Sequence, residues 1–274
     1  MGTEPWNLVH AAAQRAGVDI RPLTELEDAD PLNEVIRSTW GNSSLMPPEL
    51  VRAFQGSGNV PLGAMANGRL VGFALGFLAP DDAGVHLHSH MLAVLPDARS
   101  AGVGYALKLA QRAWALDRGI PVARWTFDPL QARNAHFNLA KLGAVGDRFF
   151  RHFYGDMDDE LNRGDRSDRL EARWDLRREP GARPAPERRP WVVLSREGTE
   201  PGPRPSEIRP PRGDPLARVE VPPDYGTLRR DHPDLAARWR QAVGDALEAC
   251  FAAGMEATAF LPDGAYVLTV RPRG

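Results

Sequence analysis

The sequence predicts an α/β (α+β) protein in which a large N-terminal domain is followed by a small appended C-terminal α/β unit. Apolar runs of strand length alternate with helical patterns along most of the 274 residues. Two pairs of apolar runs are joined by Asn67-Gly68 and Asp263-Gly264, turns that are typical of antiparallel hairpins. The stretch 180–223 contains 12 of the 25 prolines, which interrupt regular structure between the two parts.

Three helices and one strand are predicted in the first part of the chain. Apolar spacing followed by Gly17 predicts the first helix and its end. The Asp30-Pro31 pair has the form of an N-cap followed by a first-turn proline, and Pro47-Pro48 opens the next helix. The predicted elements are helix 5–16, strand 18–23, helix 30–40 and helix 47–56.

The central part of the chain predicts a strand-rich segment with two helices. Leu107, Ala110 and Trp114 share one helical face, and Gly143 is a helix stop. The predicted elements are strands 60–66, 70–78 and 85–95, helix 104–118, strand 122–127, helix 132–142, and strands 149–154 and 170–176.

The C-terminal part predicts a strand, an amphipathic helix and a hairpin. These are strand 218–221, helix 233–253, and strands 257–261 and 265–270. The apolar run 191–194 indicates that the proline-rich stretch packs in part against a core. We therefore predict a domain at 1–178, a proline-rich linker or irregular segment at 179–217, and a small unit at 218–274.

Composition excludes several classes of protein. With 42% apolar and 26% charged residues the chain is not disordered, and its formal charge of −2 gives no basic excess for nucleic acid. The longest apolar stretch, 70–79, is about half of a membrane span. Cys250 is the single cysteine, which excludes an intrachain disulfide and a cysteine-built zinc site. With no secretory signal visible, we expect a cytoplasmic protein without nucleic-acid or membrane partners.

The segment 91–104 carries the clearest chemical signal. An apolar strand runs into a short loop with Arg99, Gly102 and Gly104, and a helix begins at once. Such a turn leaves backbone N–H groups unpaired at a helix N-terminus, where they favour a phosphate or pyrophosphate. A plain tight turn is the alternative. The loop has neither the Gly-Lys-Ser/Thr of a Walker loop nor a three-glycine dinucleotide fingerprint.

The stretch Arg99-Ser100-Ala101-Gly102-Val103-Gly104 resembles the Arg/Gln-x-x-Gly-x-Gly/Ala signature of the GNAT superfamily of acyl-CoA N-acyltransferases. Leu92-Ala93-Val94-x-Pro96 matches the usual lead-in of that family, and the order of elements over 18–155 agrees. The resemblance implies a mixed, mostly antiparallel sheet flanked by helices. A narrower likeness, to an uncharacterised subfamily with a C-terminal extension, rests on Asp128, Arg133, Asn134 and His136 and on the later run 167–170.

The resemblance implies acetyl-CoA or another acyl-CoA as co-substrate. Amides of the loop 99–104 would hold its pyrophosphate, and amides of Leu92, Ala93 and Val94 would contact the pantetheine arm or polarise the thioester carbonyl. Asn134 is a further candidate for cofactor binding. The reaction implied is acetyl or succinyl transfer to a small amine, an amino acid among the acceptors, by direct attack on the thioester.

The sequence departs from the family at the acid that protonates the departing thiolate. The usual tyrosine lies four residues before Gly143, and Leu139 occupies that position. Tyr105, Tyr154 or His136 are the alternatives, Tyr154 being our choice for the site, and unassisted departure of the thiolate stays open. The missing tyrosine also motivates a second hypothesis, a catalytically idle module that binds acyl-CoA.

Candidates for the base are the three histidines of strand 85–95. His86, His88 and His90 alternate along a strand and therefore share one face. A neutral imidazole suits proton removal near pH 7, and we prefer His88 or His90. A stripe without chemistry and a zinc site are the alternatives, the latter disfavoured because no acidic ligand lies alongside in sequence. We predict no metal.

Asp128 and Arg133 follow strand 122–127 at its carboxyl end, where open sheets bind ligands. Arg133 is a candidate partner for a substrate carboxylate or a CoA phosphate, and Asp128 for the substrate. The alternative is that Asp128 caps the helix and Arg133 is solvated. A homodimer is left open.

Overall fold

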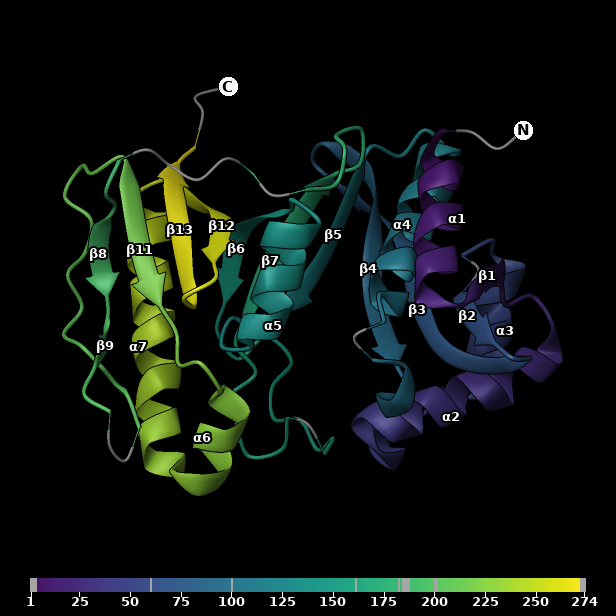
Figure 1. Cartoon of the computed structure of the whole chain (residues 1–274), viewed down its shortest axis with the longest axis horizontal. Coiled ribbons are helices and arrows are strands. Elements are labelled where there is room, and N and C mark those ends of the chain that lie inside the picture. The colour runs from purple at the N-terminus through teal and green to yellow at the C-terminus, as the bar shows by residue number, and fades with distance from the viewer. Residues whose placement is uncertain are drawn as a thin grey trace. The chain divides into compact units, whose positions relative to one another are not determined.

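A computed structural model describes residues 4–59, 61–99, 101–160, 162–181, 183, 188–199 and 202–271 (Figure 1). The chain divides into two compact units. Unit 1 comprises Met1–Trp125, Asp158–Arg163 and Asp175–Arg177. Unit 2 comprises Thr126–Met157, Gly164–Trp174 and Arg178–Gly274.

The sheet of unit 1 has the strand order β1-β2-β3-β4-β5. Neighbours pair antiparallel from β1 to β4, and β4 pairs parallel with the start of β5. Asn67 (φ 49°) and Gly68 (φ 76°) form the tight turn between β2 and β3, which confirms the predicted hairpin. The strands are β1 (Asp19–Pro22), β2 (Leu62–Ala66), β3 (Arg69–Asp81), β4 (Gly84–Val94) and β5 (Val122–Phe127), whose last two residues belong to unit 2.

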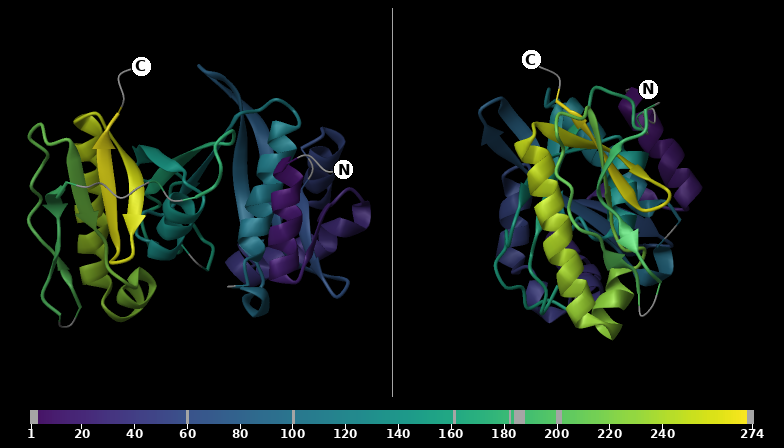
Figure 2. Two further views of the ribbon diagram at one scale, coloured as in Figure 1. Left: turned by 45° about the horizontal axis from the view of Figure 1, so that its top comes forward. Right: turned by 90° about the vertical axis from the view of Figure 1, so that its left-hand side faces the viewer.

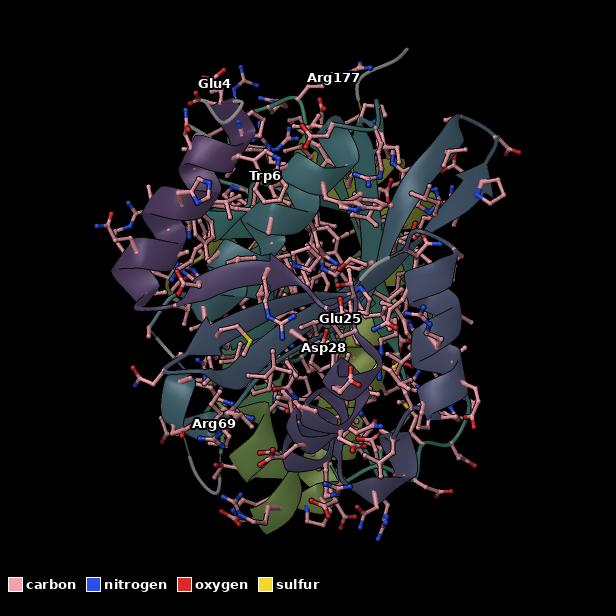
Figure 3. The ribbon with its side chains drawn as sticks, turned by 90° about the vertical axis from the view of Figure 1, so that its right-hand side faces the viewer. Glu4, Trp6, Glu25, Asp28, Arg69 and Arg177 are labelled. Carbon is pink, nitrogen blue, oxygen red and sulfur yellow. The ribbon has the colours of Figure 1, made fainter. Side chains whose placement is uncertain are left out.

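Helices cover both faces of this sheet (Figures 1 and 2). On one face α2 (Ala29–Trp40) and α3 (Pro48–Gly56) bury an apolar core with Phe73 and Leu75 of β3. On the other face lie α1 (Glu4–Ala16) and α4 (Val103–Leu116) side by side. Trp6, labelled in Figure 3, fixes this helix pair because its indole Nε1 donates to Asp117 Oδ2 at 2.7 Å.

The start of α2 differs from the prediction. The helix begins at Ala29, so that Asp28 rather than Asp30 occupies the position before it. Figure 3 shows Asp28 beside Glu25. The Asp28 carboxylate accepts the backbone N–H of Glu25 at 3.0 Å and pairs with Arg21 at 2.7 Å. Pro31 still lies in the first turn, where its missing N–H costs nothing.

Unit 2 contains a six-stranded arrangement in the order β7-β6-β12-β13-β11-β8. Long helix α7 (Pro233–Ala252) packs on it and buries Trp239, Val243, Leu247 and Cys250. The strands are β6 (Val145–Phe150), β7 (Arg169–Asp175, whose last residue belongs to unit 1), β8 (Trp191–Leu194), β11 (Leu216–Glu220), β12 (Met255–Leu261) and β13 (Ala265–Val270). The other helices are α5 (Ala132–Ala135), the π-helical turn η4 (His136–Lys141) and α6 (Tyr225–Asp231).

The compact units do not follow the predicted boundary at residue 178. Strands β6 and β7 group with the C-terminal strands because β6 pairs antiparallel with β12, Gly146 opposite Ala257. A helix followed by an antiparallel strand pair thus occurs twice in unit 2, and the two copies meet at β6 and β12.

The proline-rich segment is ordered over much of its described length, whereas a linker or irregular stretch was expected. It contributes β8, which pairs parallel with β11, and the two-stranded ribbon of β9 (Arg196–Glu197) and β10 (Arg204–Pro205). Indole nitrogens hold it in place: Trp239 donates to the carbonyl of Pro203 and Trp191 to that of Arg209. Proline forbids ladder bonds at single positions, and side chains supply the missing attachments.

One predicted strand is displaced. Residues 149–154 were expected to be extended, but β6 spans Val145–Phe150 and a turn follows it. His152 adopts φ 49°, a left-handed conformation that ends an extended chain. No helix in the described part of the chain is both long and apolar enough to cross a membrane.

Candidate active site

The strand–loop–helix turn after β4 has the geometry of an anion site. A 3₁₀ turn, η3 (Pro96–Ala98), leads to Arg99, and Gly102 at φ 96° is the residue before α4. The carbonyl of Gly102 accepts the N–H groups of Tyr105 and Ala106, while the N–H groups of Gly102 and Gly104 have no acceptor among the described residues. These donors lie at the positive end of a 14-residue helix. Ser100 lies outside the described residues.

Arg99 braces this loop. Its side chain is exposed, and its Nε donates to the carbonyl oxygen of Val94 at 3.0 Å. Arg69 at the start of β3 pairs with Asp97 at 3.1 Å, which ties the same loop to the neighbouring strand. The loop is therefore held from both sides, and the N–H of Arg99 is itself bonded to the carbonyl of Pro96, while the N–H groups of Gly102 and Gly104 stay open.

The last residues of β4 have one open edge. β4 and β5 pair only at Leu87–Ala123 and His88–Arg124 within the described residues. Leu95 donates its N–H to Val71 on β3, so the alternation of an antiparallel ladder turns the amides of Leu92 and Val94 away from β3. The same alternation directs the amide of Ala93 toward β3. Of the three amides predicted to contact the pantetheine arm or the thioester, those of Leu92 and Val94 are therefore the ones that face the open edge.

A β-bulge re-aims the side chains of β4. Ser89 lies opposite Gly76 and Met91 opposite Leu75, so His90 is the extra residue. The bulge leaves His90 and Met91 on the same face of the sheet. Before the bulge, the face of β4 that carries the histidines packs against aromatic rings. Phe77 of β3 stacks on His88 with ring centroids 5.0 Å apart, and it also stacks on Phe54 of α3 at 6.2 Å.

The three histidines have different environments. His88 and His90 have ring centroids 6.1 Å apart. Burial, and then the neighbouring His90, His86 and Lys108, lower the pKa of His88 to about 4, so His88 is neutral at pH 7. Burial also lowers the pKa of His90, the most exposed of the three. Because a very low pKa weakens an imidazole as a proton acceptor, His90 is better suited than His88 to act as base.

His86 belongs to a separate contact. Its Nδ1 lies 3.3 Å from Asp81 Oδ2, and Arg124 of β5 approaches the same oxygen at 3.2 Å. This bridge ties β3, β4 and β5 together just before β4 and β5 stop pairing. Within the described residues no group of three or more His, Cys, Asp or Glu side chains is placed to hold a metal ion.

A buried lysine that the sequence analysis missed lies on the opposite face of β4. Lys108 of α4 is 4% exposed; its Nζ donates to Ser89 Oγ at 2.7 Å and lies 3.7 Å from the ring centroid of Trp125. Ser89 in turn donates to Gln111 Oε1 at 2.8 Å. Burial lowers the pKa of Lys108 to about 7. A lysine inside the apolar run 106–110 was the available sequence signal.

Replacing Lys108 with methionine is expected to stabilise the protein, by on the order of 2 kcal/mol at pH 7, because a buried cation without a carboxylate is costly. The Lys108 side chain is protonated below about pH 10 in the unfolded chain but only below about pH 7 in the folded chain. The stabilisation by methionine should therefore be at its full value at pH 7 and below, and should disappear above about pH 10. Urea unfolding at pH 6.5 and pH 10 checks this, with Lys141→Met, an exposed lysine, as control. A gain of equal size at both pH values would contradict it.

Tyr154, the sequence-predicted acid, lies in unit 2 on the turn after β6. Its hydroxyl is 3.0 Å from Thr126 Oγ1, and the Arg169 guanidinium lies 5.3 Å from its ring centroid. Ser167 holds the turn, accepting the N–H of Tyr154 at its hydroxyl and donating to the carbonyl of Gly155. The run 167–170, noted in the sequence, thus positions this tyrosine. Its role as acid stays a prediction.

Asp128 is engaged by a buried arginine in unit 2. Arg240 of α7 donates to both of its carboxylate oxygens, at 2.6 and 3.0 Å, and also contacts Asp165. Asp128 further accepts the N–H of Leu130 at 3.0 Å, a turn contact that lies before Gln131, the N-cap of α5, so the cap that was the alternative to substrate binding is not formed. The predicted substrate role of Asp128 stays untested, and its observed contacts are those of a structural bridge.

The remaining predicted residues of this region lie on α5 and η4. Arg133, Asn134 and His136 are exposed. Leu139 is 1% exposed in the core of unit 2, so the position of the family's tyrosine presents an apolar side chain to its surroundings. Tyr105, on the first turn of α4, is partly buried, which raises the pKa of its hydroxyl. Substrate and cofactor roles of Arg133 and Asn134 remain predictions.

A helix N-terminus with open amides that follows a strand with a free edge is suited to a ligand that carries a phosphate group and an extended arm. The acetyltransferase (GNAT) family model matches residues 29–144, which include α2, the loop and α4. This part of the chain is therefore a GNAT acetyltransferase domain, of a superfamily for which acyl-CoA is the expected co-substrate.

Solved structures with a similar chain course include three acetyltransferases. The ribosomal-protein-S18-alanine N-acetyltransferase of Escherichia coli is 17% identical, with 63% of this chain and 99% of that chain covered and a TM-score of 0.45. The yncA protein of Salmonella typhimurium, a putative acetyltransferase solved with acetyl-CoA, is 16% identical (58% and 94% covered, TM-score 0.46). A GNAT-family acetyltransferase from Streptococcus pneumoniae is 18% identical (57% and 98%, TM-score 0.47). No curated protein matches the sequence.

Proposed function

We propose that this protein transfers an acetyl or succinyl group from acyl-CoA to a small amine, with direct attack of the amine on the thioester. The observation that carries the proposal is the pair of open N–H groups at Gly102 and Gly104, next to the open edge of β4 at Leu92 and Val94. The first would hold a diphosphate, and the second an extended amide-containing arm.

The residues fit such a co-substrate on steric grounds. A Cβ built on Gly104 meets Leu92 at 3.5 Å and Val94 at 3.9 Å, so this glycine lies directly against the open part of β4 without being crowded. Gly102 needs its positive φ for the turn itself. The two glycines therefore have separate roles, Gly102 in shaping the loop and Gly104 in leaving room beside β4.

Gly104→Val is expected to weaken CoA binding at least about tenfold, equivalent to about 1.4 kcal/mol, because a branched side chain fills the approach beside Leu92. The matched Gly104→Ala adds one carbon at ordinary contact distance and should change the dissociation constant less than about threefold. Calorimetric titration with CoA measures both. Absence of CoA binding by the wild-type protein would refute the proposed function.

The His90→Ala variant is expected to lower kcat/KM about 10²-fold or more if His90 removes the proton from the attacking ammonium. A base must be neutral, so wild-type activity should fall as the pH falls through the lowered pKa of His90, below about 6.5. Thiol release with acetyl-CoA or succinyl-CoA and an amine panel, followed from pH 5 to 9, tests this. Wild-type kinetics retained in His90→Ala would assign the proton to another acceptor.

The second candidate function is acyl-CoA binding without turnover. The apolar, buried Leu139 in place of the family's acid favours it. It predicts a measurable dissociation constant for CoA together with no thiol release on any amine tested, which separates it from the transferase.

A further inference from the structure

We propose that Lys108 is the proton donor to the thiolate that leaves when the acyl group is transferred. The proposal rests on the proposed function. It supplies an acid in place of the family's usual tyrosine, whose position is occupied by Leu139 in this chain. In the step, the amine nitrogen bonds to the thioester carbonyl carbon and the carbon–sulfur bond breaks. The sulfur takes the electron pair and then the proton of the Lys108 ammonium, which is afterwards replenished from solvent.

The position of Lys108 is the first argument. The last paired residues of the two strands are His88 on β4 and Arg124 on β5. The residues that follow them, Ser89 and Trp125, are the two that the Lys108 ammonium contacts. Its Nζ therefore lies at the point from which β4 and β5 stop pairing.

The length of the open edge is the second argument. From Val94, beside the loop, to Ser89 is five residues, or about 17 Å of strand. An extended pantetheine arm that begins at the amides of the loop spans a length of this order, which brings its sulfur to the end of the opening where Lys108 lies.

The chemistry of the side chain is the third argument. The chain contains 32 arginines and two lysines, Lys108 and Lys141. Arginine keeps its proton at every physiological pH, whereas a buried lysine can release one. Lys108 has no carboxylate partner among the described residues, so its burial costs stability without forming an ion pair. Groups that are buried at such a cost are candidates for function.

Three elements surround Lys108, and β4 and α4 supply its charged or titratable neighbours. β4 contributes His88, whose pKa Lys108 helps to lower. From β5 comes the uncharged ring of Trp125, while Arg124 before it is directed to Asp81. On α4 itself lie Tyr105, held neutral by its raised pKa, and Arg112, whose Nε donates to the carbonyl of Leu176. With desolvation lowering the pKa of Lys108 to about 7, ammonium and amine coexist near neutral pH.

The bulged strand separates the two proton-transfer groups. The imidazole of His90 lies on the face covered by α2 and α3, and Lys108 lies on the face covered by α4. A proton would thus be taken from the amine on one face and given to the sulfur on the other. Together they predict a bell-shaped pH profile, with an acidic limb from the base and a basic limb near pH 7 from Lys108.

Because the chain has only two lysines, the titration can be observed directly. Full-length protein labelled with [ε-¹³C]lysine should give two resonances, one of which disappears in Lys141→Met. We expect the resonance of Lys108 to titrate near pH 7 and to shift when CoA is added, while that of Lys141 is unaffected by CoA. A Lys108 resonance that titrates at the ordinary value near 10.4 would overturn the proposal.

Kinetics provide the second test. At saturating acyl-CoA, Lys108→Met should lower kcat about 10²-fold at pH 7 and abolish the basic limb, with the dissociation constant for CoA unchanged. Lys108→Arg, which keeps a charge but holds its proton, should be equally slow, and Lys141→Met should behave as wild type. CoA binding with full kcat and an unchanged pH profile in Lys108→Met would overturn the role of Lys108 alone. Failure of the wild-type protein to bind CoA would instead overturn the proposed function.

Discussion

Replacing Arg240 with methionine is expected to lower the free energy of unfolding by about 3–5 kcal/mol. Arg240 is 4% exposed and donates to the carboxylates of both Asp128 and Asp165, and Tyr225 donates its hydroxyl to Asp165 at 2.8 Å. Burial disfavours its charge, but Asp128 and Asp165 outweigh this and raise its pKa. Methionine fills a similar volume yet leaves two partly or fully buried carboxylates without their cation.

Two further variants identify the cause. Arg229→Ala removes a more distant cation, 3.7 Å from Asp165 and 30% exposed, and should cost less than about 1 kcal/mol. Asp128→Asn should destabilise the protein while leaving the KM for an amine unchanged if the carboxylate is structural. A raised KM at unchanged stability would instead support the substrate role that the sequence suggested. Urea denaturation and steady-state kinetics on the same samples separate the two.

The contribution of this bridge depends on pH in a defined direction. Burial raises the pKa of Asp128, but the charge of Arg240 and its hydrogen bonds reverse this, so the net pKa is lowered. A carboxyl group with a lowered pKa stabilises the folded state at pH values above its ordinary value, near 4, and loses that contribution as the pH falls through the lowered value. The difference in stability between wild type and Arg240→Met should accordingly be largest above pH 5.

The second large effect is expected at Gly143, where alanine should cost about 3 kcal/mol. Gly143 ends η4 at φ 76°, a conformation that costs a residue with a Cβ about 1–2 kcal/mol. A Cβ would also lie 2.3 Å from the carbonyl oxygen of Gly181, a backbone atom that must move for it to fit. Such overpacking typically adds about 1–3 kcal/mol.

Gly119 is the matched control because it follows α4 in the same way. Its φ is 71°, and nothing lies within 4 Å of a Cβ built on it. Gly119→Ala should therefore show the conformational cost alone, about 1 kcal/mol, and the difference between the two variants measures the contact with Gly181. Equal losses of stability would show that the segment around Gly181 yields freely.

Local chemistry made much of the fold predictable. The Asn67-Gly68 and Asp263-Gly264 turns, the helix stops at Gly17 and Gly143, and the loop before α4 follow from conformational preferences that act within a few residues. The prediction of 149–154 as a strand was wrong by four residues because three phenylalanines and a tyrosine favour extended structure wherever they occur.

The candidate site was predictable only in outline. Alternation placed the three histidines on one face, but the extra residue at His90 depends on pairing between β3 and β4, which sequence does not display. Lys108 looks like one polar residue within the apolar run 106–110 until α4 packs on β4 and brings Ser89 and Trp125 to its ammonium. Asp128 and Arg240 are 112 residues apart, and nothing local joins them.

The sequence by itself determined the order and approximate position of most strands and helices, the loop that leaves amides open before α4, and the family signature which that loop carries, because these depend on backbone preferences and hydrogen bonds between near neighbours. Only the tertiary structure decided which ionisable side chains are buried and which charged side chains form pairs. Burial and pairing set the pKa values of His88, Lys108 and Asp128, and both depend on residues that are distant in the chain.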